Sequence, residues 1–176
     1  MFPLDGLGHR ADLDSPRRIP RQDRLDRFDC GKEDLNRFLI RQAWNNQQAR
    51  SAQTHVLTKD LRVLGYYSLA AGSVSHDEAT ERVKKGLARH PIPVILLARL
   101  AVDISIHGKG VGSALLKDAL LQSAHAAESI GARALLVHAK DDDAGSFYEH
   151  FTFEAGPSDP YHLLLIMKDL LAIVAG

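Results

Sequence analysis

The stretch Leu100–Ser113 reads LAVDISIHGKGVGS, and it decides the fold of this chain. An apolar run from Val94 to Val102 leads into its glycines, and a helical pattern follows from Val111 to about Ile130. We therefore predict a strand, a glycine turn and a helix. The first N–H groups of such a helix have no partner inside it and lie at the positive end of its dipole. The turn is thus suited to bind an anion, and phosphate above all.

The spacing of Gly108, Gly110 and Gly112 limits which phosphate ligand the turn could hold. A P-loop would need glycine where Asp103 stands, and Ser or Thr where Gly110 stands. A dinucleotide fingerprint would need its third glycine where Ser113 stands. The spacing that remains is x-x-G-x-G directly after a buried strand. The alternative is a glycine turn that only links the strand to the helix.

Length and composition indicate an ordinary globular protein. The chain has 176 residues, 45% of them hydrophobic and 25% charged, which suits one domain with a substantial core. Its apolar runs are too short for a membrane span, and its first residues lack the apolar region of a signal peptide. Cys30 is the single cysteine, so an internal disulfide is excluded. We expect a cytoplasmic protein that does not act at a membrane.

Charge is divided unevenly along the chain although the formal net charge is zero. Residues 1–110 carry 18 basic against 13 acidic groups, and residues 111–176 carry 4 against 9. Basic groups concentrated in one part of a protein can attract nucleic acid or another anionic partner. A solvated face of uneven charge is the alternative.

Periodicity and turn residues divide the chain into a loose tail over residues 1–16, one domain over residues 17–170 and a C-terminal tail over residues 171–176. Within the domain we expect, besides the central strand and its helix, a short strand within residues 17–28, an amphipathic helix over about 32–48, a hairpin with strands 54–58 and 63–71, a helix near 75–85, a strand over 134–139, a short helix over 143–151 and a last strand over 161–168.

Arg99 is a charged residue inside the apolar central strand. Strand alternation places it on one face with Ile95, Leu97 and Ala101. A charge at such a position either pairs with a carboxylate or faces a cleft.

Four stretches together resemble a known family: FDCG at Phe28–Gly31, GYYSLAAGSV at Gly65–Val74, ARLAVD at Ala98–Asp103, and VHAK at Val137–Lys140 followed by Phe147-Tyr148. With the glycine turn they resemble the GNAT acyl-CoA N-acyltransferases, and most closely the GNAT toxins of type II toxin–antitoxin modules. The resemblance covers about residues 25–168 and implies a single-domain α/β (α+β) fold, with a mixed central sheet flanked by helices and splayed central strands. It also implies acetylation of the amino group of aminoacyl-tRNA, which blocks translation.

The resemblance assigns acetyl-CoA as co-substrate and assigns no metal. His107 stands where the superfamily usually has Gln or Arg. The residues that would contact acetyl-CoA lie on the strand end, on the turn and on the short helix: Leu100, Ala101, Val102, His107, Gly108, Lys109, Gly110, Val111, Gly112, Ser113, Ser146 and Phe147. Among the histidines and the one cysteine, no spacing typical of a metal site occurs.

Tyr148 occupies the position of the family's general acid. A phenol with a pKa near 10 can give a proton to a departing thiolate, whose thiol has a pKa near 8.5. The acceptor α-amine titrates near 7.7 to 8.0, so acetyl transfer requires no strong base. The alternative is that Tyr148 only packs the short helix onto the sheet. His138, His150 and Asp103 are weaker candidates for a proton relay, and Cys30 is expected to be structural.

The resemblance also implies the partners: aminoacyl-tRNA, a ribbon-helix-helix antitoxin, a second copy of the chain in a homodimer, and operator DNA only through the antitoxin. Basic residues that could contact tRNA are Arg99, Lys32, Arg41, Lys84, Lys85 and Arg89. Three other functions remain open: a GNAT enzyme for a small-molecule or protein amine, a non-catalytic CoA-binding regulator, and a nucleotide-binding fold of another kind.

Overall fold

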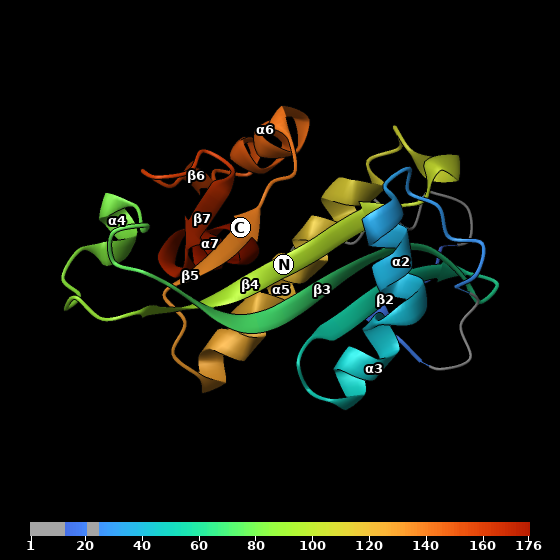
Figure 1. Cartoon of the computed structure of the whole chain (residues 1–176), viewed down its shortest axis with the longest axis horizontal. Coiled ribbons are helices and arrows are strands. Elements are labelled where there is room, and N and C mark those ends of the chain that lie inside the picture. Colours follow the sequence, from blue (N-terminus) through green and yellow to red (C-terminus); the bar gives the residue numbers. More distant parts are fainter. Residues whose placement is uncertain (1–12, 21–24) are drawn as a thin grey trace. The chain divides into compact units, whose positions relative to one another are not determined.

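The computed structural model describes residues 13–20 and 25–176 (Figure 1). Seven strands form one mixed sheet in the order β1-β2-β3-β4-β5-β7-β6. The strands are β1 (Arg17–Arg18), β2 (Gln53–Lys59), β3 (Arg62–Val74), β4 (Ile92–Val102), β5 (Ala134–His138), β6 (Glu154–Ala155) and β7 (His162–Ile166). The helices are α2 (Glu33–Arg41), α3 (Ala43–Gln48), α4 (Glu81–Lys84), the 3-10 turn η1 (Ile104–Ile106), α5 (Val111–Ser129), α6 (Asp142–His150) and α7 (Met167–Ala175).

The chain divides into two compact units. The first unit comprises Met1–Ala70 with Arg99–Leu120, and the second comprises Ala71–Ala98 with Leu121–Gly176. Strands β3 and β4 and helix α5 contribute residues to both units.

In the first unit, helices lie on both faces of the antiparallel strands β1, β2 and β3. Phe38 of α2 and Ala43 of α3 share a buried core with Tyr66 of β3. The next residue of β3, Tyr67, points to the opposite face, where its hydroxyl donates a hydrogen bond to Asp118 of α5. Adjacent strand residues face opposite sides of a sheet, so the Tyr66-Tyr67 pair fixes which helix covers which face.

The helix expected over residues 32–48 is two helices that break at Gln42. This residue has φ −123° and ψ −32°, outside the helical range, although its N–H still donates to the Phe38 carbonyl. Helix α3 then begins at Ala43, which is fully buried with Phe38 and Leu39. Glutamine itself carries no signal that ends a helix, so the break has no explanation in the local sequence.

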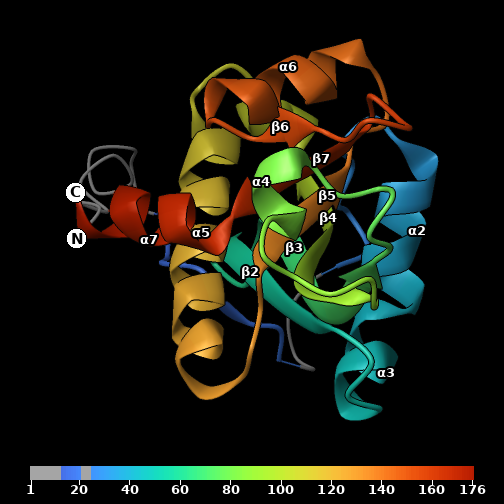
Figure 2. The same cartoon turned by 90° about the vertical axis from the view of Figure 1, so that its left-hand side faces the viewer.

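The second unit is built around β5. Strand β5 pairs parallel with β4 from Val94↔Ala134 to Leu97↔Val137, and antiparallel with β7 along its whole length. The pairing of β4 with β5 ends at Leu97 although β4 continues to Val102, in keeping with the expected parting of the central strands. Helices α4 and α6 both contact β7 (Figure 2).

Several boundaries differ from the sequence expectation. The helix near residues 75–85 is only the short α4, which Thr80 caps by accepting a hydrogen bond from the Val83 N–H at 3.3 Å. Helix α7 extends through most of the expected tail over residues 171–176, and Leu170 on its inner face is fully buried. Most of the expected N-terminal tail lies outside the described residues, but Asp14 bonds to Thr58 through both its N–H and its carboxylate. No helix in the described part of the chain has the length and apolar character of a membrane span.

Candidate functional site

The glycine turn joins the end of β4 to α5 in the first unit, as the sequence predicted. After η1 the chain passes through His107 and Lys109 with two left-handed residues, Gly108 at φ +75° and Gly110 at φ +74°. A side chain would strain the backbone at both positions. A Cβ atom added to Gly108 would meet nothing within 4 Å, so backbone conformation rather than space requires glycine there.

The turn exposes a run of backbone donors. Across residues 108–113, no N–H group has a hydrogen-bond acceptor within the described residues, and the first to bond back is Ala114, whose N–H donates to the Gly110 carbonyl at 3.2 Å. Lys109 is exposed beside them. Unpaired donors at a helix start, next to a lysine, form a positively polarised cradle that suits a phosphate or pyrophosphate.

His107 closes the turn back onto the end of β4. Its Nε2 lies 2.6 Å from the carbonyl oxygen of Val102. A carbonyl oxygen can only accept, so Nε2 carries a proton and donates it to Val102. The structure thus gives His107 a contact within the protein, through which it links the turn to the end of β4.

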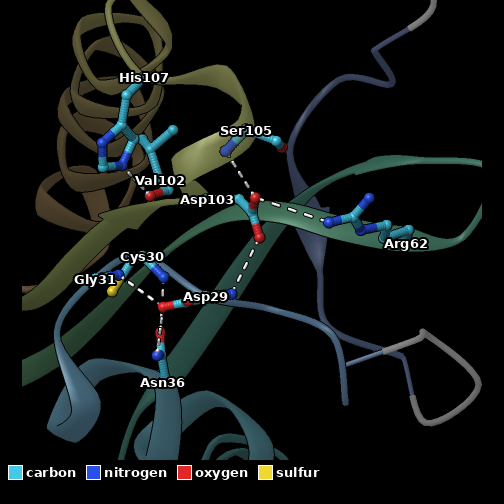
Figure 3. Close-up of polar contacts among 9 residues, drawn as sticks. All are labelled: Asp29, Cys30, Gly31, Asn36, Arg62, Val102, Asp103, Ser105 and His107. Carbon is cyan, nitrogen blue, oxygen red and sulfur yellow. Dashed lines mark hydrogen bonds and ion pairs between the residues drawn. The ribbon is translucent and has the colours of Figure 1, made fainter.

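Asp103 anchors the same turn from inside (Figure 3). It is 1% exposed, and its two carboxylate oxygens accept hydrogen bonds at 3.0 Å, Oδ2 from the N–H of Asp29 and Oδ1 from the N–H of Ser105. Burial by itself raises the pKa of Asp103, but these hydrogen bonds and the Arg62 guanidinium outweigh it and hold that pKa below its usual range. Because both oxygens already accept hydrogen bonds, the structure favours an anchor over the proton relay considered for Asp103.

The FDCG segment forms the turn that starts α2 (Figure 3). Asp29 Oδ1 accepts hydrogen bonds from the Gly31 N–H at 2.9 Å and from Asn36 Nδ2 at 3.0 Å. Asn36 Oδ1 in turn accepts from the Cys30 N–H at 2.8 Å. Gly31 has φ +87°, a left-handed conformation that favours glycine. Cys30 is buried within this turn, as expected for a structural cysteine.

Arg99 contacts an aromatic ring rather than a carboxylate. Its guanidinium carbon lies 3.8 Å from the ring centroid of Phe38 in α2. Among the described residues no carboxylate pairs with it. Phe38 stacks in turn on Tyr66, with ring centroids 6.1 Å apart. An aromatic face can hold a half-buried cation without a carboxylate, and whether Arg99 also faces a cleft stays a prediction.

The candidate tRNA-contacting cations divide between the two units. In the first, Arg41 is exposed on α2 and, with Arg37 on the same side of the helix, has no carboxylate partner in the described ranges. Sequence reasoning did not include Arg37 among the candidates, although its i, i+4 spacing from Arg41 was a usable signal. Lys32 lies just before the first residue of α2.

In the second unit, most of the basic cluster near α4 is paired with acids. Lys84 Nζ lies 3.1 Å from Glu81, and Arg89 lies 2.8 Å from Asp77. Lys85 has no carboxylate partner in the part of the chain that the structure describes. Local acids therefore offset the positive charge of two of the three candidate tRNA-contacting residues near α4, Lys84 and Arg89.

Tyr148 lies on α6, whose start is capped by Asp141 accepting from the Ala144 N–H at 2.8 Å. The Tyr148 ring packs edge-on against Phe147 and Phe153, at 5.2 and 5.4 Å between centroids. The side chain is 8% exposed, and burial raises the pKa of Tyr148 to about 12. Its hydroxyl has no hydrogen-bond partner among the described residues. Ser146 is exposed on the same helix.

A histidine pair near the start of α6 is a feature that the sequence did not reveal. His138 at the end of β5 stacks on His162 of β7, with ring centroids 4.1 Å apart. Burial and the neighbouring His162 lower the pKa of His138. The pairing follows from the register of β5 with β7, which no local signal gives. In the described ranges, no group of three His, Cys, Asp or Glu side chains is arranged to hold a metal.

Comparison with known proteins places the chain in a family. The sequence profile of the acetyltransferase (GNAT) domain matches residues 50–155. This chain is a GNAT acetyltransferase. The acetyltransferase is also 46% identical over 160 residues to the protein named tRNA-acetylating toxin from Mycobacterium tuberculosis (strain ATCC 25618 / H37Rv), and the match covers 91% of this chain and 96% of the relative.

Solved structures resemble the acetyltransferase over most of its length. One is AtaT complexed with acetyl-methionyl-tRNAfMet, with a TM-score of 0.84, 26% identity and coverage of 92% of this chain and 99% of that chain. Another is AtaT with one tyrosine replaced by phenylalanine, bound to the C-terminus of the antitoxin AtaR and acetyl-CoA, with a TM-score of 0.79, 26% identity and coverage of 94% and 99%. The seven-stranded mixed sheet of the acetyltransferase agrees with this fold.

Proposed function

We propose that this acetyltransferase moves the acetyl group of acetyl-CoA to the amino group of an aminoacyl-tRNA, and so blocks translation as the toxin of a type II toxin–antitoxin module. The observation that carries the proposal is the 46% identity to a tRNA-acetylating toxin over nearly the whole of both chains. The AtaT structure with acetyl-methionyl-tRNAfMet supports it.

The donor site of the proposal is the glycine turn. The unpaired N–H groups of residues 108–113, with Lys109, fit the pyrophosphate of CoA. Backbone groups of Leu100, Ala101 and Val102 at the end of β4 would hold the pantetheine and polarise the thioester carbonyl. His107 would act there chiefly by holding the Val102 carbonyl.

Tyr148 is the general acid of the proposal. The acceptor amine attacks the thioester carbonyl carbon, the C–S bond breaks, and the phenol O–H gives its proton to the CoA sulfur while the new amide nitrogen loses one to solvent. A pKa of about 12 keeps Tyr148 protonated throughout the neutral range. After the transfer, the Tyr148 phenolate takes up a proton from solvent, because it is a stronger base than the CoA thiolate.

We place the acceptor surface, the surface that contacts the aminoacyl-tRNA, on α2 rather than on α4. Arg37 and Arg41 are exposed and without acidic partners, whereas Lys84 and Arg89 are paired with carboxylates. A phosphate must displace a carboxylate to reach a paired cation, so unpaired cations contribute more to RNA binding. We also propose that the protein works in the cytoplasm as a homodimer, and that residues 17–170 form one catalytic domain.

The proposed protein partner is an antitoxin with a ribbon-helix-helix part, through which the pair would bind its operator DNA. The AtaT structure with the C-terminus of the antitoxin AtaR supports an antitoxin of this general kind.

Acetyl transfer from labelled acetyl-CoA to bulk charged tRNA tests the proposal, with deacylated tRNA as control and Tyr148→Phe alongside. We expect label only on charged tRNA and a kcat lowered about 10² to 10⁴-fold in the variant, with acetyl-CoA affinity nearly unchanged. The wild-type rate should rise with pH as the acceptor amine loses its proton, without a fall below about pH 11, because Tyr148 stays protonated. Label on a small-molecule or protein amine instead would reject the tRNA acceptor, and an unchanged kcat would reject Tyr148.

A further inference from the structure

The buried carboxylate of Asp103 joins the start of the glycine turn, which binds the acetyl donor in the proposal and is called the donor turn below, to the start of α2 within the first unit (Figure 3). Asp103 follows β4 directly, and it accepts the N–H of Asp29 on one oxygen and the N–H of Ser105 on the other. The main chain adds a return bond, since the Ile104 N–H donates to the Asp29 carbonyl at 2.8 Å. The two segments thus exchange hydrogen bonds in both directions around one side chain.

Two further contacts hold this junction, by which we mean the hydrogen-bonded contact between residues 29–31 and residues 103–105. The Asp103 N–H donates to the Leu64 carbonyl of β3 at 2.8 Å, and Arg62 of the same strand lies 3.8 Å from Asp103 Oδ1. A Cβ atom built on Gly31 would lie 3.7 Å from the Ile104 side chain, so the turn before α2 packs directly on η1. Strand β3 therefore holds the junction in place through Leu64 and Arg62.

The junction continues into α2 through Asp29. Its Oδ1 accepts from the Gly31 N–H and from Asn36 Nδ2, and Asn36 lies one helical turn inside α2. The same helix carries Arg37 and Arg41, the cations of the proposed acceptor surface, and it carries Phe38 under Arg99. Displacing the first turn of α2 would displace these groups.

We infer that Asp103 is a positioning residue that holds the donor turn and the start of α2 in one arrangement, so that donor binding and acceptor binding depend on the same buried carboxylate. The side chain of Asp29, in contrast, positions only the start of α2, through its bonds to Gly31 and Asn36. The assignment of α2 to the acceptor rests on the proposed function, whereas the junction itself does not. Effective reaction of two bound substrates requires their relative placement to be held closely, and this junction supplies it.

The two aspartates predict different kinetic signatures. Asp103→Ala should raise the KM for acetyl-CoA and the KM for charged tRNA, each about tenfold, because both segments lose their anchor. Asp29→Ala should raise only the KM for charged tRNA and leave that for acetyl-CoA within about twofold. A merely structural role would lower thermal stability without this split.

Asparagine substitutions separate the two roles further. Asp29→Asn keeps an Oδ1 acceptor and should behave as wild type. Asp103→Asn must turn an NH₂ group toward one of two N–H donors, so it should behave like Asp103→Ala. Asp103→Asn also serves in place of Asp103→Ala if the alanine variant does not fold. Asp26→Ala, at an exposed position of the same unit, is the matched control.

Steady-state transfer with each substrate varied in turn is the experiment, together with calorimetric binding of acetyl-CoA and amide exchange at residues 29–31. Equal effects of Asn and Ala at Asp29, or an unchanged KM for acetyl-CoA in both Asp103 variants, would overturn the inference. A wild-type protein inactive on charged tRNA would instead overturn the proposed function. The junction would then be judged by weaker acetyl-CoA binding and faster amide exchange at Asp29 in Asp103→Asn, and their absence would refute it.

Discussion

Replacing His55 should change how the stability of this protein depends on pH. His55 of β2 is 8% exposed, and its ring stacks on Tyr67 with centroids 4.9 Å apart. Its Nδ1 is buried without a hydrogen-bond partner in the described residues. Burial, and then the positive charge of Arg18 opposite it in β1, lower the pKa of His55 to about 4. The folded protein therefore keeps this imidazole neutral.

The magnitude follows from the difference between folded and unfolded states. An unfolded chain binds a proton at His55 near pH 6.5, whereas the folded chain does so only near pH 4. Between these values the unfolded state holds more protons, so the free energy of unfolding falls as the pH falls. The full difference is about 3 kcal/mol at 1.36 kcal/mol per pKa unit, and about 2 kcal/mol of it should be lost between pH 7 and pH 5.

Urea unfolding of the wild type and of His55→Phe at pH 7 and pH 5 measures this difference. Phenylalanine keeps a planar ring against Tyr67 and cannot take up a proton, so the variant should lose about 2 kcal/mol less than the wild type over this interval. His138 titrates in both proteins and cancels in the comparison. His55→Leu is a second variant should the larger ring not fit, and His125→Gln at an exposed position is the control. An equal loss in wild type and variant would refute a buried neutral His55.

Two further predictions concern backbone geometry. Gly108→Ala should weaken acetyl-CoA binding about fivefold in a calorimetric titration, since holding alanine in the left-handed region costs about 1 kcal/mol, whereas Gly108→Asn should bind nearly as wild type. Equal affinity of the Ala and Gly proteins would show that the turn binds in another conformation. Arg133→Ala should speed amide exchange in α4 about tenfold or more, because Arg133 donates to the carbonyls of Arg82, Val83 and Lys85 at the end of that helix. Arg133→Lys should restore part of the protection, and unchanged exchange in the Ala protein would contradict this capping role.

The strand, turn and helix around Leu100–Ser113 were predictable because each rests on neighbouring residues. A nearly continuous apolar run marks the strand, left-handed positions require Gly108 and Gly110, and a helical pattern marks the helix. The hairpin of β2 and β3 was predictable for the same reason, and its turn is formed by Asp60 and Leu61.

The elements that the sequence misjudged depend on contacts between distant residues. Helix α7 occupies most of the stretch expected to be a tail, and its inner residue Leu170 is fully buried. Helix α4 is short and is held by Arg133, nearly fifty residues away in the chain. Packing across the fold overrode local preference at each of these positions.

The candidate site shows the same division. By itself, the sequence determined which residue types stand at the glycine turn, at Tyr148 and along α2, because motif and spacing are properties of neighbours in the chain. Tertiary structure alone decided that burial raises the pKa of Tyr148, that Arg99 lies over Phe38, and that acids pair with the cations near α4. It also decided that Asp103 serves two segments at once, because burial, charge pairing and hydrogen-bond geometry are set by residues that only folding brings together.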